Sequence, residues 1–355
     1  MKFSLAINLE RMNPSTDMRD VMRHTLDMVQ MAERGGFEIA WAAEHHAIEM
    51  TIAPNPFQIL GWWGSHTSTI RLGTAVVVAP YWHPIRVAGE AAMLDLLTNG
   101  RLEFGIGCGA YQREFNRMAG GVKAQESVPY MLEMLPLVKQ LWQGDVEHHG
   151  KYWSFPKATS TPKPLQKNPP IWVAARNPVS FDWAVANDCN IMTWAMTRDF
   201  HEVETYKQRF EDSLAKAPAG TKRPRLSTMR HTGVYARADD WEPYVNSMRR
   251  VAGQFENLFR ELGDVDNGFP EQVDLAALEH RAEYDADMLR TNLMFGTPDE
   301  VIAKLKRYEA LGFDNFIYYA SYGLPMELQR KSLKLFVDEV MPAFAERPGL
   351  KRVAE

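Results

Sequence analysis

The sequence predicts an α/β protein, and specifically a (β/α)8 TIM barrel. Strand-like and helix-like segments alternate along the whole chain, which is typical of parallel sheets built by right-handed crossovers. The 355 residues, 45% of them hydrophobic, are enough for one large core. Polar and aromatic residues follow the carboxyl ends of the strands, where barrels place their chemistry. A doubly wound open sheet is the second possibility.

The predicted strands are short apolar runs bounded by turn residues, and the predicted helices show a period of 3.6. Gly35-Gly36 and Asn99-Gly100 are helix stop signals, and Thr297 is a helix cap. The strands cover residues 3–9, 37–43, 70–79, 101–107, 171–175, 190–194, 226–236 and 314–320. The helices cover residues 17–35, 55–68, 84–97, 126–143, 179–187, 200–217, 239–261, 298–311 and 326–344.

Two segments between these elements are predicted to lack regular structure. Residues 151–170 are rich in Pro and Lys and are expected to form a loop. Residues 262–296 follow the seventh helix, are acidic and contain Gly and Pro. An insertion at this place in a barrel is expected to be a mobile loop or a lid. No break in composition divides the chain, so residues 1–355 are expected to form one domain.

The composition argues against several classes of function. The chain has 40 Lys and Arg against 45 Asp and Glu, a net charge of −5, which gives no electrostatic reason to expect nucleic acid or an anionic membrane as a partner. No apolar run reaches the roughly 18 residues of a membrane span, and no signal-peptide pattern is seen. Cys108 and Cys189 are too few for a disulfide framework or a multi-cysteine zinc site, which indicates a reducing cytoplasm.

Glu44, His45 and His46 directly follow a buried strand and are the leading candidates for catalysis. Imidazole exchanges protons near neutral pH, so acid/base chemistry is expected there. Metal binding is the weaker alternative, because adjacent strand residues point to opposite faces and no third ligand has suitable spacing. One of the two imidazoles is expected to serve only as support.

Two turns at the predicted rim could approach an anion or a flat ligand. The 105–109 segment, GIGCG, matches a dinucleotide fingerprint only in part, because the third glycine spacing is absent and no short helix is expected directly after it. Arg176, Asn177 and Ser180 lie in a strand-to-helix turn that would suit a phosphate. An ordinary capped helix explains this turn equally well.

Several blocks in order carry a resemblance to a known family: EHH at 44–46, APNP at 53–56, RLGTAVVVAPYWHP at 71–84, NGRLEFGIGCGAYQREF at 99–115 and GTPDEVIAKLKRYEALGFDNF at 296–316. Over nearly its whole length the chain resembles the bacterial luciferase-like flavin-dependent monooxygenases. The resemblance implies a (β/α)8 barrel that takes reduced FMN from a separate NAD(P)H flavin reductase. It also implies oxidation of a small organic substrate with dioxygen.

The resemblance also implies roles for individual residues. His45 is the catalytic histidine, with Glu44 and His46 beside it, and Glu44 is expected to orient it. The peptide between Ala75 and Val76 corresponds to a flavin contact that is often cis. The remaining flavin contacts are expected at Cys108, Arg176, Asn177, Ser180, Thr193 and Trp194. An apolar wall around the substrate is expected from Trp41, Trp62, Trp82 and Tyr111.

The strand-four motif departs from the family at two positions. Cys108 stands where relatives commonly have an arginine, and a thiol cannot make the bidentate phosphate contact of a guanidinium. Arg176 or Arg113 is expected to supply the missing charge. Gly107 stands where luciferase has a reactive cysteine, so light emission is not expected.

Two rival functions share the barrel: a deazaflavin-dependent oxidoreductase that transfers hydride, and a flavin-binding barrel without activity. The Glu-His-His cluster argues against the second. The AYQREF segment at 110–115 resembles members that open N-heterocyclic rings such as pyridinium acids. A homodimer or a higher homo-oligomer is expected.

Overall fold

Eight parallel strands close a barrel in the computed structural model, which describes residues 1–345. Strand β1 pairs with both β2 and β14, which joins the two ends of the sheet and confirms the predicted (β/α)8 fold. In order around the barrel the strands are β1 (Lys2–Ala6), β2 (Ile39–Ala42), β3 (Arg71–Thr74), β5 (Leu102–Gly107), β8 (Ile171–Ala174), β9 (Asn190–Trp194), β10 (Leu226–Val234) and β14 (Asn315–Tyr319).

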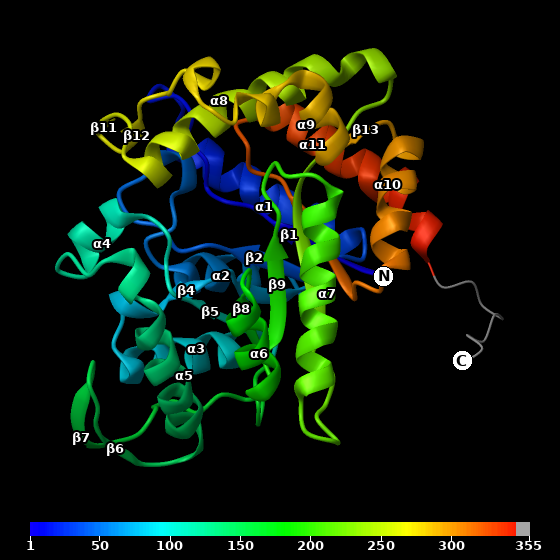
Figure 1. The fold of residues 1–355 in the computed structure, drawn as a ribbon. Helices are drawn as coiled ribbons and strands as arrows, with labels where there is room; N and C mark the ends of the chain where they lie inside the picture. The colour runs from blue at the N-terminus through cyan, green and yellow to red at the C-terminus, as the bar shows by residue number, and fades with distance from the viewer. Residues whose placement is uncertain (346–355) are drawn as a thin grey trace.

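The helices between the strands cover the barrel (Figure 1) and start where capping residues stand. Asp17 and Asn55 accept backbone N–H groups at two helix starts, and Thr297 forms a capping box with Glu300. The main helices are α1 (Met18–Arg34), α2 (Pro56–Ser65), α3 (Pro84–Leu97), α5 (Val128–Gln143), α6 (Pro178–Ala186), α7 (Phe200–Lys216), α8 (Glu242–Arg260), α10 (Pro298–Ala310) and α11 (Met326–Leu335). None of the helices in residues 1–345 has the length and apolar character needed to span a membrane.

Three local predictions were wrong. The third strand is interrupted by a cis peptide between Ala75 and Val76, and its continuation is the short β4 (Val77–Val78). The helix α4 (Gln112–Met118) follows the glycine-rich segment after a few residues. The predicted loop at 151–170 contains β7 (Ser154–Ala158), which pairs with β6 (Val146–His149).

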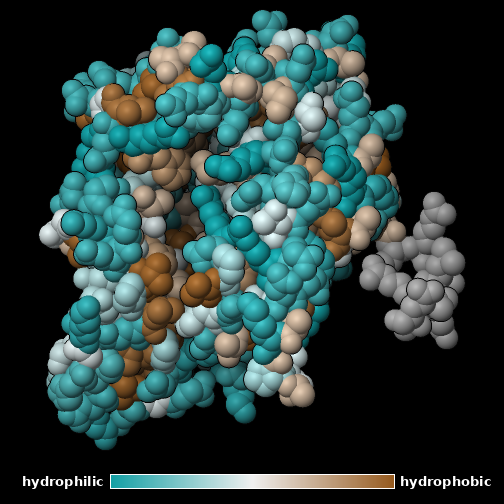
Figure 2. Space-filling view, viewed as in Figure 1, coloured by the Kyte–Doolittle hydropathy of each residue, from teal (hydrophilic) through white to brown (hydrophobic). Residues whose placement is uncertain are grey.

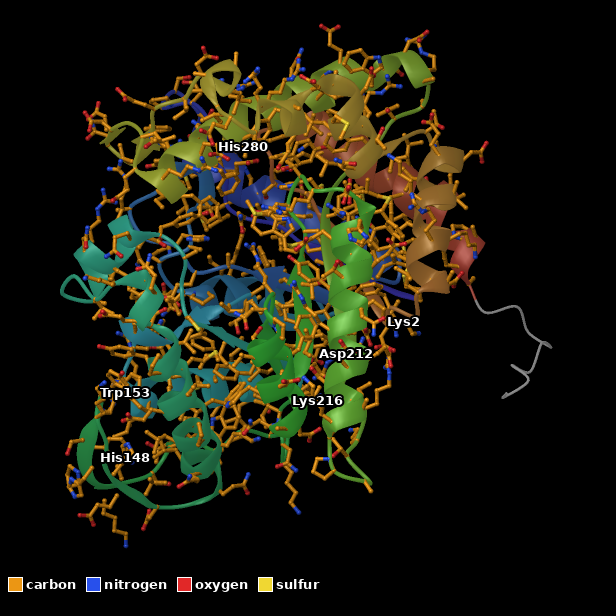
Figure 3. The ribbon with its side chains drawn as sticks, in the orientation of Figure 1. Lys2, His148, Trp153, Asp212, Lys216 and His280 are labelled. Carbon is orange, nitrogen blue, oxygen red and sulfur yellow. The ribbon has the colours of Figure 1, made fainter. Side chains whose placement is uncertain are left out.

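The β6–β7 hairpin is held to α5 by one carboxylate. Glu133 accepts the backbone N–H groups of Tyr152 and Trp153 and lies 3.0 Å from Nε2 of His148. Since this contact joins segments 15 to 20 residues apart, the local sequence pattern could not show it. Figure 3 places His148 and Trp153 at the opposite end of the molecule from His280 of the 262–296 segment.

The 262–296 segment is folded. It contains the hairpin of β11 (Val265–Asp266) and β12 (Phe269–Pro270), the helix α9 (Ala286–Asn292) and the strand β13 (Met294–Gly296), which pairs with β10. Figure 1 shows the hairpin and α8 beyond the end toward which β9 points, which is the carboxyl rim. The carbonyl of Gly268 accepts the N–H of Glu49 at 2.7 Å, which ties the hairpin to the loop after β2. Closure of this segment over the rim remains a prediction.

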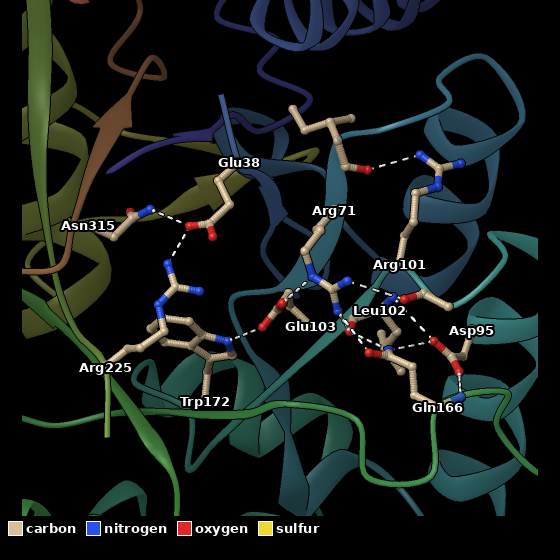
Figure 4. A network of polar contacts seen from close by, with 12 residues as sticks. Glu38, Arg71, Asp95, Arg101, Leu102, Glu103, Gln166, Trp172, Arg225 and Asn315 are labelled. Atoms are coloured by element: carbon tan, nitrogen blue, oxygen red, sulfur yellow. Dashed lines mark hydrogen bonds and ion pairs between the residues drawn. The ribbon is translucent and has the colours of Figure 1, made fainter. Parts of the chain in front are cut away.

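The amino end of the barrel is closed by a polar network (Figure 4). Glu103 is buried and pairs with Arg71, and it accepts the indole N–H of Trp172 at 2.5 Å. Above this network the ring of Trp41 packs edge-on against Trp172, with ring centroids 5.3 Å apart. The barrel interior is therefore blocked at one end and can hold a ligand only at the carboxyl end.

Gly73→Ala is expected to destabilise the protein by about 1–3 kcal/mol. A methyl group at Gly73 would lie 2.1 Å from Cε3 of Trp41, and both residues belong to the packed barrel interior. Gly61 on α2 is the matched control, because a methyl group there meets no atom within 4 Å. Gly61→Ala should leave the midpoint of urea unfolding unchanged or raise it slightly. Equal midpoints for the two variants would contradict the expected clash.

Candidate active site

The carboxyl rim of the barrel holds a cavity with two adjoining lobes. The inner lobe lies in the barrel mouth, and the outer lobe extends toward α4, α5 and α6 with a volume of about 700 Å³. This volume is within the range of small-molecule sites. Figure 2 shows apolar residues gathered in a hollow on this face. Both lobes are lined by His45, Ala75, Val76, Ala174, Arg176 and Trp194.

Glu44 is buried in the wall of the outer lobe and is fully engaged with other groups. Its carboxylate accepts the backbone N–H of Val78 at 2.6 Å and the indole N–H of Trp82 at 2.7 Å, and it lies 2.9 Å from Nε2 of His46. Glu44 therefore positions His46 and the third-strand segment. The prediction that Glu44 orients His45 is wrong.

His45 instead pairs with Glu114, which sequence reasoning missed. Nδ1 of His45 lies 3.3 Å from each carboxylate oxygen of Glu114, and the side chain of Glu114 is 1% exposed. Glu114 also accepts the backbone N–H of His46 at 2.6 Å. Because a carboxylate only accepts, a proton on Nδ1 satisfies this contact and leaves Nε2 of the neutral ring as the free nitrogen.

The residues predicted to contact the flavin ring lie together on the cavity. Ala75 and Val76, joined by the cis peptide that the resemblance implies, line both lobes. Thr193 lines the inner lobe, and its hydroxyl donates to the carbonyl of Ser227 at 3.1 Å. Trp194 lines both lobes, and its indole Nε1 is buried without a hydrogen-bond partner among residues 1–345.

The residues predicted to bind phosphate lie on the outer lobe. Asn177 caps α6: its Oδ1 accepts the N–H of Ser180 at 2.9 Å, and the Ser180 hydroxyl accepts the N–H of Arg176 at 3.2 Å. These contacts are those of an ordinary capped helix, which was the alternative to a phosphate site. The Arg176 guanidinium remains available to bind an anion. Arg113 does not supply the charge, since it donates to Gly263 and Asn257 at the 262–296 segment.

Cys108 lines the outer lobe with its sulfur 3.9 Å from Sδ of Met131. Burial raises the pKa of the Cys108 thiol to about 11. Cys108 is therefore a neutral, apolar wall residue at neutral pH and cannot replace an arginine electrostatically.

Two of the four predicted wall residues reach the cavity. Trp41 lines the inner lobe, and Tyr111 lines the outer lobe beside Phe259. Trp82 does not line the cavity, because it packs against Phe57 and donates to Glu44. Trp62 lies on α2 against His66 and is also away from the cavity, so both predictions were wrong. Sequence reasoning missed Asn8 and Phe259 as cavity residues.

Comparison with known proteins identifies the family of the chain. The profile described as luciferase-like monooxygenase matches residues 1–315. The chain belongs to the luciferase-like monooxygenase family. Within residues 1–345, no group of three or more His, Cys, Asp or Glu side chains is placed to hold a metal ion.

Three known proteins match nearly the full length of this chain. The oxygenase component of a flavin-dependent trigonelline monooxygenase from Acinetobacter baylyi is 39% identical over 347 residues, covering 98% of this chain and 96% of its own length. An F420-dependent glucose-6-phosphate dehydrogenase from Microbacterium testaceum is 25% identical, covering 91% and 93%. The oxygenating constituent of 3,6-diketocamphane monooxygenase from Pseudomonas putida, solved with FMN, shares the fold with a TM-score of 0.74, 18% identity and coverage of 96% and 98%.

Proposed function

We propose that this protein is the oxygenase component of a two-component system that uses reduced FMN and dioxygen to oxygenate an N-heterocyclic pyridinium acid. The observation that carries the proposal is the His45–Glu114 pair, which presents an imidazole to a cavity walled by Ala75, Val76 and Trp194. The substrate class is supported by the 39% identity to the trigonelline monooxygenase component. The words "oxygenase component" in the name of that relative support a separate flavin reductase as partner.

The cavity residues fit FMN. Gly107 has no side chain, and a methyl group there would lie 2.5 Å from Val76, so the backbone closely approaches the cis segment. The small side chain of Ala75 and the unpartnered indole N–H of Trp194 suit a flat ring with polar edges. Arg176 and the start of α6 would hold the phosphate. Bound reduced FMN would supply the electrons that activate dioxygen.

The residues of this chain would handle protons and exclude water. His45 would give or take a proton at Nε2, and Glu114 would hold the ring and stabilise its protonated form. Asn8 donates to the Tyr319 hydroxyl at 2.9 Å, which leaves the proton of that hydroxyl free to be donated to a ligand in the inner lobe. Apolar walls from Trp41, Tyr111 and Phe259 would keep bulk water from the reacting atoms.

We expect a homodimer that buries the outer face of α3. Met93, Leu96 and Leu97 are 47%, 42% and 70% exposed, which is unusual for large apolar side chains of one helix. A monomer in light scattering at micromolar concentration would contradict this expectation.

The decisive experiment measures dioxygen uptake and product mass with enzymatically reduced FMN and a panel of N-heterocyclic acids. For each dioxygen consumed, a gain of 16 mass units over the pyridinium acid is expected, because one oxygen atom is transferred and the other leaves as water. Oxidation of the substrate by hydride transfer to an oxidised deazaflavin, with no dioxygen uptake, would favour the dehydrogenase function instead. A tight flavin complex without turnover would favour a binding protein.

Glu114→Gln is expected to lower kcat by about 10- to 100-fold with a smaller change in KM, because the imidazole loses its charged partner while the amide keeps the shape. The backbone N–H of His46 can still donate to the amide oxygen, so the fold should be retained. The measurement is kcat and KM against pH, since a positioning role also changes the pH profile. A pH profile identical to wild type would contradict the role given to Glu114.

A further inference from the structure

A second cleft adjoins the catalytic cavity and contains three arginines. Arg176, Arg198 and Arg209 line it together with Asn177 and Tyr206. Arg176 and Trp194 are walls of this cleft and of both lobes of the catalytic cavity. A ligand whose ring lies in the cavity could therefore extend a substituent past Trp194 into the cleft.

The charges of this arginine cleft are poorly neutralised. Arg209 donates to the carbonyl of Arg176, and the Arg176 guanidinium lies 5.8 Å from the ring centroid of Trp194. The Arg198 guanidinium makes no hydrogen bond or ion pair within residues 1–345. Among the described residues that line the cleft, Glu202 alone is acidic. Gathered positive charges repel one another, and a bound anion would relieve this repulsion.

We propose that the arginine cleft binds the carboxylate of an aromatic acid substrate while its ring lies in the catalytic cavity. This inference rests on the proposed function and specifies how the acid is recognised. The planar guanidinium fork matches a carboxylate with two parallel hydrogen bonds. The turn predicted to hold the flavin phosphate contributes Arg176 and Asn177 to both the cleft and the outer lobe, whereas its Ser180 lines the outer lobe and not the cleft.

The test compares two ligands that differ only in the anionic group: 1-methylpyridinium-3-carboxylate, which is trigonelline, and 1-methylpyridinium-3-carboxamide. Calorimetry gives Kd for both with wild type, Arg198→Gln and Arg198→Lys, and fluorescence gives the FMN Kd. Arg198→Gln should weaken carboxylate binding about 10- to 100-fold and change carboxamide binding and FMN binding less than twofold. The carboxylate Kd of Arg198→Lys should lie between the values for wild type and Arg198→Gln. Lys222→Gln, which removes one exposed positive charge outside the cleft, should match wild type.

Each other result overturns the inference in a distinct way. Equal loss for carboxylate and carboxamide, or no loss for either, means that the cleft does not recognise the anion. Loss of FMN affinity with unchanged carboxylate affinity assigns the cleft to the flavin phosphate. The proposed function is tested separately by dioxygen uptake. If wild type takes up dioxygen and Arg198→Gln leaves the ratio of the carboxylate and carboxamide Kd values unchanged, only the inference about the cleft is wrong. If the wild-type protein takes up no dioxygen with any pyridinium acid, the proposed function is wrong. Carboxylate binding by the cleft is then tested with benzoate and benzamide, by the ratio of their Kd values in wild type and in Arg198→Gln.

Discussion

His45→Ala is expected to lower the rate of substrate oxygenation by about 10²- to 10⁴-fold, which is the usual contribution of a positioned acid or base. His45 is the titratable side chain that lines both lobes of the cavity and is held by a buried carboxylate. Consumption of dioxygen should continue, with hydrogen peroxide released in place of product. The measurement is product formed per dioxygen consumed, with reduced FMN supplied by a reductase.

His201→Ala is the matched control for this prediction. His201 is exposed on α7 and pairs only with Glu204 within the described residues, so this variant should behave as wild type. A His45→Ala enzyme that forms product at the normal rate would remove His45 from the mechanism. If His45→Ala lowers the rate of product formation but still binds flavin as wild type does, the lost activity concerns proton transfer and not the shape of the site.

Arg71→Ala is expected to destabilise the barrel by about 3–5 kcal/mol, because it leaves the buried carboxylate of Glu103 without its counter-charge. Arg71 also donates to the carbonyl of Leu102 at 2.9 Å and to Gln166 at 3.0 Å (Figure 4). The measurement is the free energy of unfolding in urea at pH 8. The double variant Arg71→Ala/Glu103→Gln should recover part of the loss, since the amide carries no charge.

The loss caused by Arg71→Ala should depend on pH in a defined direction. Burial already raises the pKa of Glu103 above its ordinary value, while Arg71 lowers it, so removing Arg71 raises this pKa further. A raised carboxyl pKa in the folded state stabilises the protein below the unfolded pKa, and this contribution is lost as pH rises through the folded pKa. The deficit should therefore be smaller at pH 5 than at pH 8. Equal deficits would indicate lost packing and not an unpaired charge.

The sequence alone was sufficient for the barrel, the family and the placement of Glu44, His45 and His46 on the rim. The strands are short apolar runs, and the helices carry caps such as Asp17, Asn55 and Thr297, so each element is specified by neighbours within a few residues. Closure of eight parallel strands then places every strand end on one rim.

Partners within the site were decided only by the tertiary structure. Glu44 and Glu114 are both near the histidine pair, but α4 brings Glu114 to His45 across 69 positions of sequence, while Glu44 faces Trp82 and His46. The same holds for Trp62 and Trp82, whose rings point away from the cavity, and for Arg113, which binds the 262–296 segment. Local pattern determines which residues reach the rim. The direction of each side chain depends on packing between distant segments, which no short stretch of sequence encodes.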